Sequence, residues 1–213
     1  MSNEFLIDRL TVGLKPVRPR KPVIDGVIIG GICLLELILF LGMGATRPNM
    51  PLAMVQPSFW WKLTGLGLIA LFSGAAAVMS FDPVRSPRRG LIAVVALVAI
   101  CLGAGWMIDA GRGGWGAVVG RLDWRNGIWC VHDMTLLAIP PVMGLGVLMQ
   151  RGAPTDRKGT AWMVGIAAAA WGAFVFVFAC PFDDPLYTAV WYSVGCGIVT
   201  VVSRLALPIL TRW

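Results

Sequence analysis

Six long apolar stretches constrain the fold of this chain more than any other feature of its sequence. They cover residues 23–44, 61–81, 91–109, 130–149, 160–180 and 186–207. A helix rises 1.5 Å per residue, so about 20 apolar residues are needed to cross the hydrocarbon layer of a membrane. Charged residues make up only 14% of the chain, whereas about 25% is usual in soluble domains. The sequence therefore predicts an all-α polytopic membrane protein, with a bundle of six transmembrane helices over residues 23–213.

The Lys and Arg residues divide unequally between the two sides of this predicted bundle. Thirteen of the eighteen fall in residues 1–22, in the loops 82–90 and 150–159, and near the C-terminus, all on one side. The other five are Arg47, Lys62, Arg112, Arg121 and Arg125. Positive residues stay in the cytoplasm, so the N- and C-termini are both predicted to be cytoplasmic. Because the net charge of +7 lies in loops beside the bilayer, we predict lipid as a partner and no direct contact with nucleic acid.

Residues 1–22 form a predicted cytoplasmic leader, large enough to present a recognition surface. Its apolar side chains recur at helical spacing: Leu6, Ile7, Leu10 and Leu14. Three prolines then end the helix and stiffen the tether to the first span: Pro16, Pro19 and Pro22. A helix this short is marginal alone in water. It is therefore expected to fold against a surface, either the inner leaflet or a groove on a partner protein.

Several local patterns predict further details. The basic tether residues are expected to bind anionic lipid: Arg18, Arg20 and Lys21. The pair Pro140–Pro141 is expected to kink the fourth span, and Asp184 before Pro185 is expected to cap the sixth. Small residues within the spans are expected to let helices pack closely, among them Gly26 and Gly30, which are four apart. Tryptophans near the outer connections are expected to form an interfacial belt, among them Trp61, Trp106 and Trp191.

Two of the five cysteines stand apart from the others by position. Cys130 opens the predicted fourth span and Cys180 closes the fifth, and counting out from the short turn between them places both at one depth. Adjacent helices pack about 8–10 Å apart, and a disulfide needs α-carbons about 4.4–6.8 Å apart. Facing thiols can close that gap. A structural or sensory disulfide, independent packing and a metal site all remain open.

The metal alternative depends on His132, two residues after Cys130. Thiolate and imidazole together suit Zn, Cd or Cu. However, side chains two apart on a helix point in different directions, and the chain has no CxxC and no HxxxH. We therefore predict no metal and no other cofactor, with Cys130, His132 and Cys180 as weak candidate ligands.

Glu36 lies within the first span, where an ionisable side chain is costly and needs a partner or a proton. Lys62 is the nearest candidate partner by depth. An acid at this depth also leaves an alternative function open, as a small membrane transporter or a thiol-redox membrane enzyme. The chain contains no P-loop, GxSxG, HExxH or CxxC motif, so we do not predict an enzyme.

These residues resemble the NrsF-type integral-membrane anti-sigma factors, the negative regulators of sigma F. The leader motif 6–10 followed by 14–18 carries the resemblance, together with 59–62, 151–154 and the last two residues. The most specific part is Cys-Pro-Phe-Asp-Asp-Pro at 180–185, with Leu-Tyr after it and Trp191-Tyr192 further on.

The resemblance implies a protein of the bacterial inner membrane that is a regulator. Its cytoplasmic leader would bind an extracytoplasmic-function (ECF) sigma factor and keep it from RNA polymerase. It also implies that the paired outer cysteines, here Cys130 and Cys180, sense a stress such as heavy metals or oxidants. From the helical pattern we expect the leader contacts to be Leu6, Ile7, Leu10 and Leu14.

Overall fold

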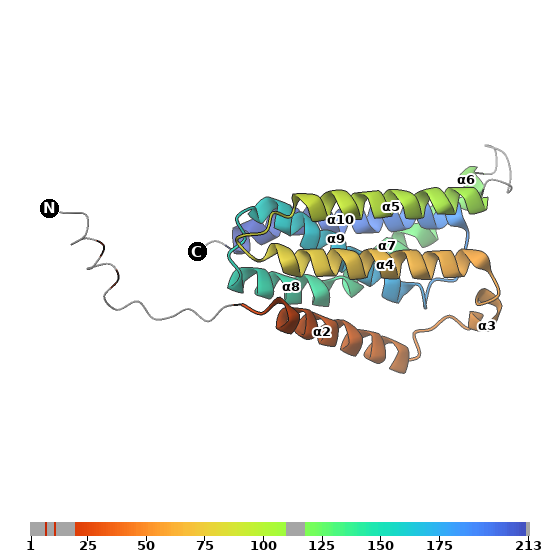
Figure 1. Cartoon of the computed structure of the whole chain (residues 1–213). Coiled ribbons are helices and arrows are strands. Elements are labelled where there is room, and N and C mark those ends of the chain that lie inside the picture. Colours follow the sequence, from red (N-terminus) through yellow and green to blue (C-terminus); the bar gives the residue numbers. More distant parts are fainter. Residues whose placement is uncertain (1–6, 8–10, 12–19, 110–117, 212–213) are drawn as a thin grey trace.

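The computed structural model describes residues 7, 11, 20–109 and 118–211. Within these ranges the chain is all-helical and contains no strand. Six of the described helical segments are long and apolar enough to cross a membrane. The predicted fold class is therefore confirmed, and the architecture is compatible with a multi-pass membrane protein (Figure 1).

Five spans are single helices and the fourth is broken into two. The single helices are α2 (Pro22–Gly42), α4 (Pro57–Ser80), α5 (Arg88–Asp109), α9 (Arg157–Phe176) and α10 (Pro185–Leu210). The fourth span consists of α7 (Trp124–Leu137) and α8 (Ile139–Arg151). Two short helices lie in connections, α3 (Met50–Ala53) and α6 (Val118–Arg121).

The break in the fourth span lies at Ala138, as the two prolines predicted. Pro140 and Pro141 have no N–H to donate to the preceding turn, which favours their place in the first turn of a new helix. In the structure they occupy the first turn of α8. The fourth span is thus interrupted beside the two prolines.

Helix α9 forms the centre of the bundle and packs against α4, α7, α8 and α10. Its Ala- and Gly-rich sequence permits this close packing. A methyl group on Gly165 would lie 2.8 Å from the Thr200 α-carbon, and one on Gly172 would lie 2.7 Å from the Met134 carbonyl oxygen. Helix α2, by contrast, contains no buried residue. Gly26 and Gly30 face open space, so the prediction that they mark a close helix contact is wrong.

Two helix ends differ from the sequence prediction, and both concern the cysteines. Helix α7 begins at Trp124, because the Asp123 side chain accepts a hydrogen bond from the Asn126 N–H and caps the helix. Cys130 therefore lies in the second turn instead of opening the helix. Helix α9 ends at Phe176, so Cys180 lies four residues beyond it and does not close it. Pro181 follows, and it cannot continue helical hydrogen bonding.

The bundle has two distinct ends. We call the end formed by residues 177–184, α3, α6 and the first turns of α4, α7 and α10 the cysteine end. We call the other end, where Arg20 precedes α2, the leader end. Figure 1 shows α3 and α6 together at the cysteine end, away from the start of α2.

Candidate functional site

The segment 177–184 at the cysteine end is held by two cations from distant parts of the chain. Arg47 donates its backbone N–H to the Phe178 carbonyl oxygen at 2.9 Å and its guanidinium Nη1 to the Cys180 carbonyl oxygen at 2.8 Å. Lys62 donates its ammonium to the Phe182 carbonyl oxygen at 2.9 Å. These bonds satisfy carbonyls that neither α9 nor α10 can pair, so they fix the path of the chain on both sides of Cys180.

Asp183 balances these two cations within the protein. Its carboxylate lies 2.8 Å from Arg47 Nη1 and 3.2 Å from Lys62 Nζ. Both cationic side chains are 1% exposed and that of Asp183 is 9% exposed. One carboxylate against two cations leaves a net positive charge in a region poor in water. Sequence reasoning missed this cluster, since it used Arg47 only as a topology marker and considered Lys62 as a partner of Glu36.

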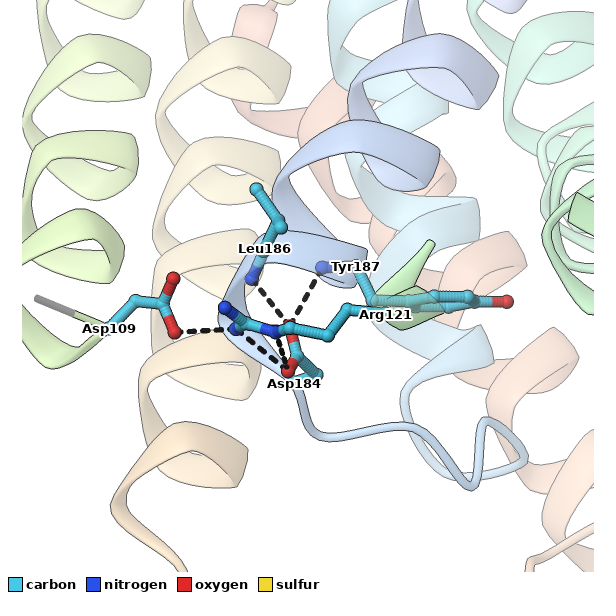
Figure 2. Close-up of polar contacts among 5 residues, drawn as sticks. All are labelled: Asp109, Arg121, Asp184, Leu186 and Tyr187. Atoms are coloured by element: carbon cyan, nitrogen blue, oxygen red, sulfur yellow. Dashed lines mark hydrogen bonds and ion pairs between the residues drawn. The ribbon is translucent and has the colours of Figure 1, made fainter. Parts of the chain in front are cut away.

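The next residue, Asp184, belongs to a second and more exposed cluster. It accepts the backbone N–H groups of Leu186 and Tyr187 at 2.9 and 3.0 Å and so caps α10, as predicted. Figure 2 shows Arg121 lying between Asp184 and Asp109, with bonds to both carboxylates. These bonds raise the pKa of Arg121, that to Asp109 most strongly. Arg121 therefore ties α6 to the end of α5 and the start of α10.

The structure brings Cys130 and Cys180 together in one buried cluster at this end. Both are free thiols. Cys130 Sγ lies 3.2 Å from the Tyr187 hydroxyl oxygen, and the Cys180 thiol donates to the Phe182 carbonyl oxygen at 3.6 Å. The predicted proximity of the two thiols is thus observed, although neither lies where the predicted helix ends placed it.

The surroundings of Cys180 favour its thiolate form. A hydrogen bond from the Cys130 thiol is the main cause that lowers the pKa of Cys180, and the Lys62 ammonium and the Tyr192 hydroxyl act in the same direction. Burial opposes them, because it disfavours any charge. A thiolate is the reactive form of cysteine toward oxidants and soft metals. These neighbours therefore favour a negative charge at Cys180, although the residue is fully buried.

His132 is not part of this cluster. Its side chain is 56% exposed and lies 3.1 Å from the Asp133 carboxylate. Cys130, two residues earlier on α7, is buried. No group of three or more metal-binding side chains is assembled within the described ranges.

Glu36 and Trp191 lie in surroundings that differ from those predicted. Glu36 accepts a hydrogen bond from the Trp171 indole N–H at 3.0 Å, while Lys62 is occupied by Asp183, so the predicted Glu36–Lys62 pair is wrong. Trp191 is 5% exposed and donates to the Leu122 carbonyl oxygen at 2.6 Å. It packs where Gly127 has no side chain, so it is a core residue and not part of an interfacial belt.

At the leader end, Arg20 joins the chain ahead of α2 to the bundle. Its Nε lies 2.6 Å from Asp25, and its Nη2 donates to the Leu148 carbonyl oxygen of α8 at 2.9 Å. The guanidinium also lies over the Phe81 ring, 4.9 Å from the ring centre. Arg20 was expected to bind lipid, and the structure corrects this, because its guanidinium is held by the protein.

Two residues of the predicted leader helix are described. Ile7 and Thr11 are helical and exposed, and the Thr11 hydroxyl donates to the Ile7 carbonyl oxygen at 3.0 Å. The Ile7 residue is 58% exposed. The other expected contacts, Leu6, Leu10 and Leu14, lie outside the described residues.

The six helices of membrane-crossing length are compatible with the class of multi-pass membrane proteins. The chain belongs to the family described as negative regulator of sigma F (NrsF), whose model matches residues 10–213. It is similar to the anti-sigma-F factor NrsF of Caulobacter vibrioides (strain NA1000 / CB15N), with 28% identity over 222 residues that cover all of both chains. No solved structure matches the chain.

Proposed function

We propose that this protein is an integral-membrane anti-sigma factor. It holds an ECF sigma factor through its cytoplasmic leader, residues 1–22, and releases it when Cys130 and Cys180 react with a stress agent. The match to the family of sigma F negative regulators over residues 10–213 is the observation that carries this proposal.

The proposed location is the bacterial inner membrane, with both termini in the cytoplasm. The excess of Lys and Arg on the side of the leader supports this orientation. The cysteine end then faces the oxidising compartment outside, where thiol pairs can form disulfides. This arrangement puts the sensing chemistry and the sigma factor on opposite sides of the bilayer.

The proposed contacts with the sigma factor are Leu6, Ile7, Leu10 and Leu14. An apolar helical stripe is a common way for a short segment to bind a groove on a partner. The exposed, helical Ile7 supports this reading, because its apolar side chain is not used by the bundle.

The proposed signal is a covalent or coordinate change at the thiol pair. With a two-electron oxidant such as a peroxide, Cys130 and Cys180 would lose two protons and two electrons in total and form one disulfide. With a soft metal ion, both sulfurs would lose their protons and coordinate the ion. In either case the bonds to Tyr187 and to the Phe182 carbonyl oxygen change.

The fourth span supplies a physical route from the thiols to the leader. Cys130 lies on α7, which joins α8 at the break beside Pro140. Helix α8 presents the Leu148 carbonyl oxygen to Arg20, the residue that anchors the chain ahead of α2. We propose that movement of α7 changes the angle at the break and weakens the hold of α8 on Arg20.

Co-purification of the sigma factor with the full chain in detergent tests the leader's role. The chain should retain the sigma factor, and Leu6→Asp and Leu10→Asp should each lose it, because an acid on the apolar stripe cannot enter a groove. Asp8→Asn, off the stripe, serves as the matched control. Equal recovery with all variants would overturn the role of the leader.

A further inference from the structure

The connection from α2 to α4, residues 43–56, has an apolar outer surface at the cysteine end. Between Gly42 and Lys62 the sequence contains one charged residue, Arg47. Its side chain is turned inward, 1% exposed and bound to Asp183. The exposed large side chains of the connection and of the first turn of α4 are all apolar: Met43, Leu52, Met54, Val55 and Trp60. A continuous apolar surface of this kind marks contact with a partner or a membrane.

Helix α3, within this connection, has an inner and an outer side. Ala53 is 2% exposed and belongs to the buried cluster that contains the two thiols. Leu52 and Val55 face outward and are 72% and 83% exposed. The Trp60 indole N–H donates to the Met54 carbonyl oxygen at 2.8 Å and ties the end of α3 to the first turn of α4. The helix is therefore held in place on one side, while its apolar outer side contacts nothing within the bundle.

The neighbouring spans fix the depth of α3 relative to a bilayer. Helix α4 has 24 residues and is therefore about 36 Å long, only a few Å more than the roughly 30 Å hydrocarbon layer. Its first turn, to which α3 is tied, lies at the edge of that layer. Figure 1 shows α2 stopping short of the end where α4 begins, so the connection covers the remaining depth beside the bundle. Lipid surrounds the bundle at that depth.

The start of α7, at the same end, has a different surface. Its first turn exposes Arg125 and Asn126, and the Asp123 side chain caps it. Residues 48–61 contain no charged side chain at all. A surface that carries charges suits water, whereas an uncharged surface with large apolar side chains suits the boundary between headgroups and acyl chains.

We propose that α3 is an in-plane membrane helix, with Leu52 and Val55 inserted among the acyl chains of the leaflet at the cysteine end. Interfacial helices bury an apolar face about 5–10 Å into the boundary of headgroups and acyl chains. The partner is lipid and not a second copy of the chain, because the surface of α3 continues the exposed apolar surface at the end of α2, formed by Leu39, Leu41 and Met43. The inference goes beyond sigma-factor binding and rests on the membrane location within the proposed function.

Spin labels on single cysteines of the full chain in nanodiscs test the proposal. The background carries Cys33→Ala, Cys101→Ala and Cys196→Ala. It keeps Cys130 and Cys180, which are 4% and 0% exposed and are not expected to react with the label. The background chain without an added cysteine measures any remaining label.

The readout is the collision rate of each label with oxygen, which concentrates among acyl chains, divided by its collision rate with a water-soluble nickel chelate. This ratio should be high for Leu52→Cys and Val55→Cys. Leu34→Cys, on α2 and 56% exposed, is the control for lipid contact. Asn126→Cys, at an exposed position of α7, is the matched control for water at the cysteine end.

Two outcomes at positions 52 and 55 would overturn the proposal. A ratio as low as that of Asn126→Cys would show that α3 faces water. Slow collisions with both reagents, together with spin–spin broadening, would show that a second copy covers α3. The Leu34→Cys control separates this failure from failure of the proposed membrane location: a high ratio there leaves the location intact, and a low ratio overturns both.

Discussion

Asp183 and Asp184 are neighbours in the sequence, yet the structure predicts very different costs for neutralising them. Asp183→Asn leaves two cations, Arg47 and Lys62, each 1% exposed and without a carboxylate. Removing one partner of a buried ion pair costs about 3–5 kcal/mol, because the remaining charge stays desolvated. We therefore expect Asp183→Asn to lower the free energy of unfolding by at least about 3 kcal/mol, which is roughly a hundredfold in the folded-to-unfolded ratio.

Asp184→Asn is the matched control. Asn caps a helix as well as Asp does, so α10 should keep its cap. The lost ion pair with Arg121 is partly exposed, with side chains 18% and 31% accessible. Pairs of this kind contribute about 0–1 kcal/mol. The expected destabilisation is therefore below about 1 kcal/mol.

Reversible unfolding of both variants in mixed micelles, followed by tryptophan fluorescence, measures the difference. The double variant Lys62→Met with Asp183→Asn should be more stable than Asp183→Asn alone, because one of the two stranded charges is gone. Equal stability of Asp183→Asn and Asp184→Asn would refute the buried-cluster reasoning. So would a double variant that is no better than the single one.

Three further predictions concern packing, thiol chemistry and coupling. Gly172→Ala should lower the free energy of unfolding by about 1–3 kcal/mol, because the new methyl group would meet the backbone at Met134 and Ala138. In the same unfolding assay, Gly26→Ala should not lower it, because Gly26 faces open space. The alkylation rate of Cys180, followed by mass spectrometry, should rise less between pH 7 and 9 than that of an ordinary thiol, because its pKa is lowered; a normal titration curve would contradict this. Arg20→Gln should alter thiol-triggered sigma release in a reporter assay, and Lys21→Gln, at an exposed position, should not.

The spans were predictable because length and hydropathy are local properties of the sequence. The break at Ala138 and the cap at Asp184 were predictable for the same reason, since proline and aspartate act within one helical turn. The exact helix ends were not predicted. Asp123 caps α7 and Pro181 follows the end of α9, and both residues lie in stretches that hydropathy assigns to connections. This shifted Cys130 and Cys180 relative to their helices while leaving them in one buried cluster.

The polar clusters at the cysteine end could not be predicted from local patterns. Arg47 and Asp183 are more than a hundred positions apart, and only the packing of α4, α9 and α10 brings them together. One signal was present: the Asp-Asp pair at 183–184 lies beside a cysteine on the side of the bundle that also carries Arg47, Lys62 and Arg121. Pairing acids with cations on the same side would have suggested the partners. Glu36 shows the limit of that approach, because depth alone pointed to Lys62 and the partner is Trp171.

The most direct test of the central claim is the affinity of the purified sigma factor for the full chain in nanodiscs, measured before and after the thiol pair is oxidised. The account predicts tight binding in the reduced state and at least about a tenfold weaker affinity after oxidation, within the usual range of coupling between distant sites. The Cys130→Ser, Cys180→Ser double variant should bind equally well under both conditions. Unchanged affinity of the native chain on oxidation, or the same loss in the double variant, would contradict the account.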